Sequence, residues 1–112
     1  MSQLHFKKCF WPMIMSGQKR TTIRRWNAPR VKPQSRAWAP GLGWLFVESV
    51  EQIDLKKLTL ADAEADGFAS VVSMQKTLFD FYPDYKTDGR NWFRVTFRPE
   101  QIQQPAPTLF SQ

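Results

Sequence analysis

Residues 91–98 alternate between two kinds of side chain, and this pattern restricts the fold more than any other feature of the sequence. One set is apolar and the other is mostly polar, and in an extended backbone the two sets point to opposite faces. The apolar set is Phe93, Val95 and Phe97, and the other set is Trp92, Arg94, Thr96 and Arg98. Such a segment is typical of a strand that covers a core with one face. Because the chain has 112 residues, we expect a single domain built around that sheet.

Three further segments are rich in β-branched and aromatic residues and predict strands. They are a short strand at 4–8, a strand at 21–26 and a strand at 44–53. In the last of these, Phe46 and Val50 are expected on one face, with Val47 outside that register.

Three short helices are predicted by residues that begin and end helices. Pro12 and Gly17 bound a helix near 11–16, because proline suits the first turn and glycine the position after the last one. Thr59 caps a second helix that ends at Gly67, and Asp62 follows the cap by three residues. Ser70 caps a third helix that ends near Tyr82, before Pro83. Its core-facing stripe is Val71, Met74, Leu78 and Phe81.

These elements do not alternate as strand, helix, strand, so they predict an α+β fold with mostly antiparallel strands. A chain this short favours a small, partly closed β-barrel with about three short helices at its ends. The proline- and glycine-rich segment 27–43 is predicted to be a long basic loop or a poorly formed strand. We expect one domain over residues 1–100 and an irregular tail, rich in proline and glutamine, over residues 101–112.

Charge is segregated along the chain. The first 40 residues hold nine basic side chains and no acidic one, whereas the net charge of the whole chain is +6. A positive face attracts polyanions through its long-range field and through counterion release. The segregation favours binding of a nucleic acid or nucleotide over a solvated basic surface without a partner.

One cysteine, Cys9, and one histidine, His5, limit the chemistry of the chain. A single cysteine excludes an internal disulfide and a cysteine-cluster zinc site, and a single histidine excludes a multi-histidine metal site. We therefore expect no metal and no cofactor. The apolar run at 9–15 is too short for a membrane span and has no cleavage site after it. We expect a cytoplasmic protein without a membrane segment.

The segment GQKRTTIR at 17–24 resembles the GxKxxTIR signature of the ASCH family, whose domains have the PUA-like fold. Three later segments agree with the same family in the same order. They are LTLADAEADGF at 58–68, LFDFYP at 78–83 and WFRVTF at 92–97. Segment 27–43 departs from the family, which commonly has a turn and a strand there.

The resemblance implies binding of RNA or of a single modified base in a cleft. One bacterial branch of the family acts as an amidohydrolase on N4-acetylcytidine, and ribonuclease activity has been proposed for another. By resemblance, Lys19 and Thr22 stand at two catalytic positions of the amidohydrolase, and Asp66 stands where that branch has a glutamate. Lys19 would be the base that activates the Thr22 hydroxyl, and Asp66 would pass a proton to the leaving amine. Glu64 competes for this role, and a plain helix-end carboxylate is the alternative for Asp66.

Alternation in the predicted strand 21–26 places Thr22, Arg24 and Trp26 on one face and leaves Ile23 for the core. This arrangement suits a groove in which a base stacks on Trp26, although Trp26 packing under the 27–43 segment is the alternative. The full set of expected nucleic-acid contacts is Lys8, Lys19, Arg20, Arg24, Arg25, Trp26, Arg30, Lys32, Arg36 and Trp38.

We therefore expect a protein that binds RNA or a modified nucleobase in a basic cleft. An N4-acylcytidine amidohydrolase and a ribonuclease are the two enzymatic alternatives. A protein-interaction module is a third, for which the tail is the only indication.

Overall fold

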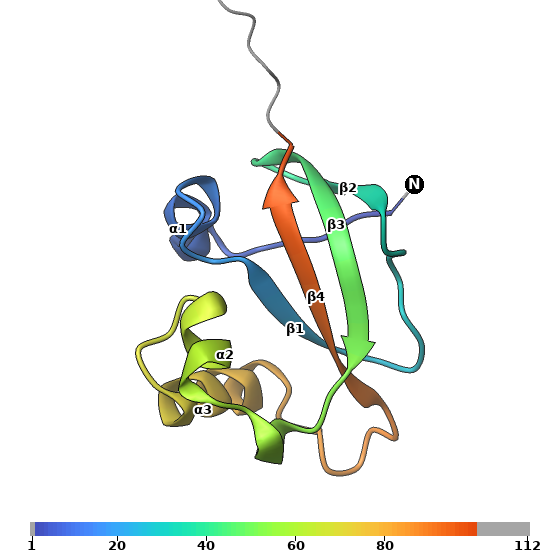
Figure 1. Ribbon diagram of the computed structural model, residues 1–112. Helices are drawn as coiled ribbons and strands as arrows, with labels where there is room; N and C mark the ends of the chain where they lie inside the picture. Colours follow the sequence, from blue (N-terminus) through green and yellow to red (C-terminus); the bar gives the residue numbers. More distant parts are fainter. Residues whose placement is uncertain (1, 101–112) are drawn as a thin grey trace, which may run out of the picture.

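The computed structural model describes residues 2–100 of the chain. Four strands form one antiparallel sheet in the order β1-β4-β3-β2 (Figure 1). Their bounds are Thr21–Trp26 (β1), Ser35–Ala39 (β2), Gly43–Gln52 (β3) and Asn91–Pro99 (β4). β1 and β2 are the two edges, so this part of the chain forms an open sheet. The α+β class and the antiparallel pairing are confirmed, whereas these strands do not close into the expected barrel.

Five helical segments accompany the sheet within residues 2–100. They are η1 (Lys8–Phe10), α1 (Trp11–Met15), η2 (Leu55–Lys57), α2 (Leu60–Ala65) and α3 (Val71–Phe81). In Figure 1, α2 and α3 lie together beside the lower part of the sheet, and α1 lies above them. The three predicted α-helices are confirmed with their caps at Thr59 and Ser70. No helix within residues 2–100 is long and apolar enough to cross a membrane.

One sequence prediction about strands was wrong, and a second had left a loop and a strand as alternatives. Segment 4–8 is not a strand, since only an isolated bridge from Gln3 to Trp38 touches the sheet and η1 begins at Lys8. Segment 27–43, predicted to be a long loop or a poorly formed strand, contains the strand β2, which pairs along its length with β3. The small residues Ala37 and Ala39 point into the core from β2, so this strand lacks the bulky apolar alternation that predicts strands.

A β-bulge explains a third difference. The register of β3 against β4 shifts between Val47 and Ser49, which inserts one residue into β3. Val47 lies opposite Phe97 and Val50 lies opposite Val95, so both valines face the core. Phe46 lies opposite Arg98 on the other face. The prediction that Phe46 and Val50 lie on the same face of the sheet was therefore wrong.

The sheet has an apolar cluster on each face. The larger cluster contains Phe93, Val95 and Phe97, as the alternation of β4 predicts, together with Leu4 and Trp26. The second cluster lies between β1 and the two helices α2 and α3, and it contains Ile23, Leu55, Ala63, Met74 and Leu78. Of the predicted stripe on α3, Met74 and Leu78 are buried and Phe81 is exposed. The predicted tail at 101–112 lies outside the described residues.

Candidate functional site

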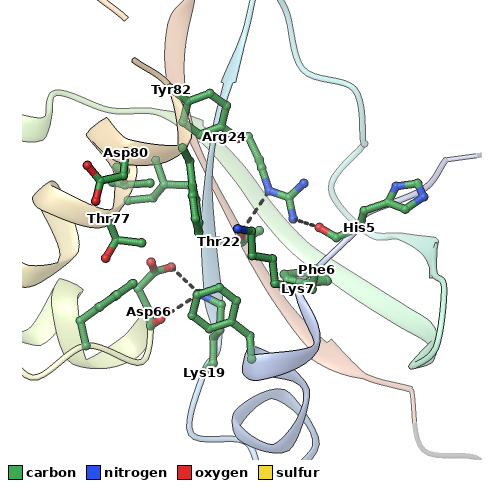
Figure 2. A pocket seen from close by; sticks show the side chains of 15 residues that line it. His5, Phe6, Lys7, Lys19, Thr22, Arg24, Asp66, Thr77, Asp80 and Tyr82 are labelled. Atoms are coloured by element: carbon green, nitrogen blue, oxygen red, sulfur yellow. Dashed lines mark hydrogen bonds and ion pairs between the residues drawn. The ribbon is translucent and has the colours of Figure 1, made fainter. Parts of the chain in front are cut away.

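A cavity of about 450 Å³ lies along β1, at the edge of the sheet (Figure 2). Since β1 is an edge strand, side chains from the N-terminal segment and from α3 reach the same space from opposite sides. The lining residues are His5, Phe6, Lys7, Phe10, Lys19, Thr22, Ile23, Arg24, Asp66, Phe68, Thr77, Leu78, Asp80, Phe81 and Tyr82. The cavity therefore brings together the three residues that the resemblance singled out, and Arg24 with them.

Lys19 and Asp66 form a buried ion pair in this cavity. The Lys19 ammonium lies 3.2 Å from Asp66 Oδ1, and it also donates a hydrogen bond of 2.8 Å to the backbone carbonyl of Asp66. Lys19 is 4% exposed and Asp66 is 2% exposed. A buried charge is stable only when it is paired, so the pair fixes the end of α2 against the start of β1.

Burial moves the pKa values of the two groups toward each other. The pKa of Lys19 is lowered chiefly because burial disfavours the ammonium ion, and the charge of Asp66 opposes this. The pKa of Asp66 is raised chiefly because burial disfavours the carboxylate, and the charge of Lys19 opposes this. The site therefore holds a potential base and a potential acid in direct contact, which is the arrangement that proton transfer needs.

Thr21 and Thr22 form hydrogen bonds with different groups, because successive side chains of β1 point to opposite faces. Thr22 lines the cavity and its Oγ1 accepts a hydrogen bond of 3.1 Å from Nε of Arg24. Thr21 points to the other face and its hydroxyl donates a hydrogen bond of 2.9 Å to Asp66 Oδ1. Arg24 is held in turn by a hydrogen bond of 2.7 Å from its guanidinium to the carbonyl of His5.

Aromatic rings surround the charged groups. The Lys19 ammonium lies 5.1 Å from the ring centre of Phe10 and 5.8 Å from that of Phe68. The Arg24 guanidinium lies 4.9 Å from the ring centre of Phe6. These cation–π contacts stabilise the cations in addition to their hydrogen bonds. The sequence gives no indication of this aromatic lining, because rings from the N-terminal segment and from the loop after α2 meet only in the folded chain.

Asp80 and Tyr82 were also missed as lining residues. They come from α3 and its end, opposite the N-terminal segment that carries His5 and Lys7 (Figure 2). The only sequence signal was the LFDFYP segment at 78–83, which the resemblance identified without assigning a role to its side chains.

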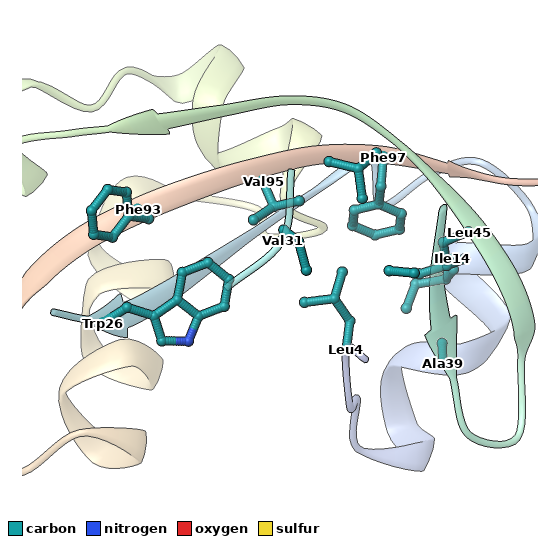
Figure 3. Packing of buried hydrophobic residues seen from close by; sticks show 11 residues of the cluster. Leu4, Ile14, Trp26, Val31, Ala39, Leu45, Phe93, Val95 and Phe97 are labelled. Carbon is teal, nitrogen blue, oxygen red and sulfur yellow. The ribbon is translucent and has the colours of Figure 1, made fainter. Parts of the chain in front are cut away.

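Trp26 and Arg25 do not face the cavity. Trp26 is 8% exposed and lies in the larger core cluster, where its ring centre is 6.1 Å from that of Phe93 (Figure 3). The core therefore leaves no face of Trp26 for a base, and the alternative reading, packing under the 27–43 segment, agrees with buried Val31 in the same cluster. Arg25 is buried against the ring of Trp92 and pairs with Asp88 at 3.0 Å.

The remaining expected contacts are spread over the surface. Arg36 pairs with Glu100 at 2.9 Å and stacks on Trp44, and Trp38 packs edge-on against the same ring. Four other basic side chains are exposed and do not line the cavity, namely Lys8, Arg20, Arg30 and Lys32. Within residues 2–100, no three His, Cys, Asp or Glu side chains gather closely enough to hold a metal ion.

Solved structures share this fold at low sequence identity. Hypothetical protein PH0355 matches with a TM-score of 0.72 and 17% identity over 87% of this chain and 96% of its own. The ASCH domain from Lactobacillus crispatus matches with a TM-score of 0.69 and 12% identity over 87% of this chain and 77% of its own. A mutant of ZmASCH from Zymomonas mobilis matches with a TM-score of 0.57 and 21% identity over 88% of this chain and 68% of its own.

These matches establish the fold alone, and they confirm at that level the ASCH resemblance predicted from the motifs. No model of a known protein family matches the chain, and no curated protein matches it in sequence.

Proposed function

We propose that this chain, which has the fold of the ASCH domain, binds a single modified nucleobase in the cavity along β1. The observation that carries the proposal is the buried Lys19–Asp66 pair, which lines the same cavity as Thr22 and Arg24. Burial of a charged pair at the wall of a cavity is costly for folding, and such pairs are common where binding or chemistry requires them.

The shape and lining of the cavity suit a planar ring. Its volume of about 450 Å³ falls within the ordinary range for small-molecule sites. Its aromatic side chains offer surfaces on which a base can stack, and its polar groups can fix the orientation of the base. Lys7 lies at the cavity over the ring of Phe81, where its ammonium can contact a phosphate attached to the sugar.

Amide hydrolysis of an N4-acylated cytosine is the second candidate function, and the direction of the two pKa shifts favours it. Burial lowers the pKa of Lys19 and raises that of Asp66, so it reduces the cost of moving the shared proton from Lys19 to Asp66. In the form with the proton on Asp66, Lys19 is a neutral amine that can accept the proton of the Thr22 hydroxyl. The oxygen of Thr22 then attacks the acyl carbon, the carbon–nitrogen bond breaks, and the departing amino group takes its proton from Asp66. The acyl group remains on Thr22 as an ester.

Water completes the reaction. A water molecule loses a proton to Asp66 and its oxygen attacks the ester carbon. The bond between that carbon and the Thr22 oxygen breaks, the Thr22 oxygen takes its proton from Lys19, and the carboxylic acid is released. The guanidinium of Arg24, already hydrogen-bonded to Thr22, is placed to stabilise the negative oxygen of each tetrahedral intermediate.

One incubation experiment tests both candidates. Native protein, Lys19→Met, Thr22→Val and the surface control Lys76→Met are mixed with N4-acetylcytidine and, separately, with a short RNA. We expect the native protein and the control to bind N4-acetylcytidine. If the second candidate function is correct, cytidine and acetate form only with these two proteins, with a loss of at least about 100-fold in the two cavity variants. Circular dichroism establishes that each variant is folded.

The other outcomes are informative. Binding of N4-acetylcytidine without turnover, lost in Lys19→Met and kept in Lys76→Met, would leave nucleobase binding as the function and exclude hydrolysis of this substrate. Cleavage of the RNA by native protein and not by the cavity variants would favour the ribonuclease alternative. Absence of both binding and turnover would contradict the proposal.

A further inference from the structure

Thr21 contacts the reactive pair from outside the cavity. Its side chain is buried, with 7% of the residue exposed, and its hydroxyl donates to Oδ1 of Asp66. The Lys19 ammonium contacts that same oxygen. Within residues 2–100, the second carboxylate oxygen of Asp66, Oδ2, accepts no hydrogen bond, although Asp66 lines the cavity.

We propose that Thr21 is a positioning residue, which holds Oδ1 of Asp66 against Lys19 and so leaves Oδ2 for a hydrogen-bond donor of the ligand. This inference rests on the proposed function, because it assigns the cavity a ligand that presents an N–H group to Oδ2. The exocyclic nitrogen of an acylated or free aminopyrimidine is such a group.

The geometry around Asp66 leaves its carboxylate little freedom. Asp66 caps the C-terminal end of α2, and its backbone carbonyl accepts the second hydrogen bond from Lys19. Gly67 follows with a φ of +90°, a conformation that glycine adopts readily and that turns the chain away from the helix. With the backbone fixed there and Oδ1 held by two donors, rotation of the carboxylate would break at least one of these contacts.

Thr21 also influences when Asp66 takes up a proton. A hydroxyl that donates to a carboxylate stabilises the charged form, so Thr21 lowers the pKa of Asp66 against the stronger effect of burial. Lys19 and Arg24 lower it through their charges. The other titratable groups that line the cavity are Lys7 and His5 from the N-terminal segment, and Asp80 and Tyr82 from α3 and its end.

Because Lys19 and Asp66 are in contact, they titrate as a pair. The more acidic step of the pair belongs mostly to the carboxylate. Removal of the Thr21 hydroxyl should raise the pKa of this step. The acidic limb of the pH profile of binding or turnover should then move to higher pH. A role limited to filling space would leave both unchanged.

The test compares Thr21→Val, which keeps the shape of the side chain, with Thr21→Ser, which keeps the hydroxyl. Thr96→Val is the matched control, because Thr96 lies opposite Thr21 in the sheet and its hydroxyl donates no hydrogen bond to Asp66. The carbon signal of the Asp66 carboxyl group is followed by NMR as the pH changes. We expect the midpoint of the Asp66 titration to move to higher pH in Thr21→Val and to stay at its native position in Thr21→Ser and Thr96→Val.

Unchanged titration in Thr21→Val, or an equal rise in Thr21→Ser or Thr96→Val, would overturn the inference. If Thr21→Val does not fold, Thr21→Ala supplies the variant without a hydroxyl. The titration is independent of any substrate, so the two proposals fail separately. A shifted titration without binding of N4-acetylcytidine would refute the ligand assignment and the proposed function but keep the hold of Thr21 on Asp66. Unshifted titration in a protein that binds the nucleoside would refute the role of Thr21 alone.

Discussion

Lys19 and Asp66 show how much one pair of residues can constrain a small domain. Each charge would be strongly unfavourable if it were buried alone. In the pair, one ion pair and one hydrogen bond from Lys19 to the Asp66 backbone take the place of contacts with water. A hydrophobic pair of similar volume would stabilise the fold as well or better. Stability alone therefore does not account for two charges buried beside a cavity.

The variant Lys19→Met should be less stable than the native protein by about 3 kcal/mol, because it leaves Asp66 buried without its partner. The double variant Lys19→Met with Asp66→Leu should recover most of this loss, since no uncompensated charge remains. Urea denaturation at pH 7 measures the free energy of unfolding of both single variants and the double variant. Losses that simply add would contradict this view of the pair, because residues in contact should be coupled.

Single residues differ in how far the sequence could predict their roles. Lys19, Thr22 and Asp66 were predicted through the GxKxxTIR segment and its later companion segments, and Arg24 was predicted through the alternation of β1. All four residues line one cavity. Alternation also placed Trp26 on the same face of β1 as Thr22, but it could not reveal that the chain after β1 would cover that ring. Which face a side chain takes is a local property, whereas what lies over it depends on distant residues.

At the scale of elements, α2 positions Asp66 because both of its ends are fixed. Thr59 and Asp62 form a capping box at the start, in which the Thr59 hydroxyl accepts from the Asp62 backbone and the Asp62 carboxylate accepts from the Thr59 backbone. Arg94 of β4 donates to Asp62 at 2.8 Å, so the first turn of α2 is tied to the sheet. The last turn leads directly to Asp66.

This capping box should make stability depend on pH in the acidic range. The hydrogen bond from the Thr59 backbone is the main cause of the lowered pKa of Asp62, and Arg94 adds to it. A lowered folded-state pKa contributes stability above the unfolded value of about 3.9, and the contribution is lost as the pH falls through the folded value. Native protein should therefore exceed Asp62→Asn in stability by about 1 kcal/mol at pH 6, and the difference should shrink and vanish as the pH falls through the lowered folded-state pKa of Asp62.

Urea denaturation at several pH values measures this difference, and Asp84→Asn serves as a control because Asp84 is exposed in a turn after α3. A difference between native and Asp62→Asn that stayed constant down to pH 2 would contradict the role of the ionised carboxylate.

Elements that a few neighbouring residues indicate were predicted from the sequence. Features that depend on pairing with another strand were not. The caps at Thr59 and Ser70 and the alternation of β4 are readable over a few residues, so α2, α3 and β4 were correct. β2 offers only two alanines to the core, and its existence depends on pairing with β3. The bulge in β3 is likewise a property of its register against β4.

At the scale of the whole molecule, the basic first 40 residues do not form one basic cleft. Arg25 is engaged with Asp88, Arg36 is engaged with Glu100, and Lys19 is engaged with Asp66. Among the nine basic residues of that segment, those that line the cavity are Lys7, Lys19 and Arg24. The basic residues are thus clustered in the sequence but not in space, because the fold distributes the first 40 residues over the edge strands β1 and β2 and their connections.

This distribution predicts a weak dependence of RNA binding on salt. If a strand enters the cavity with one base and contacts Lys7 and Arg24 through phosphates, log K should fall with log salt with a slope near −1.4, since each contact to a single strand contributes about −0.7. Nine contacts would give a slope near −6. Binding of a labelled single-stranded RNA between 50 and 200 mM salt, as rough bounds, measures the slope. Lys7→Met should reduce it by about 0.7, whereas Arg30→Met, a change outside the cavity, should leave it unaltered. A native slope near −6, or a loss of slope in Arg30→Met equal to that in Lys7→Met, would mean that the strand follows the dispersed basic surface instead of entering the cavity.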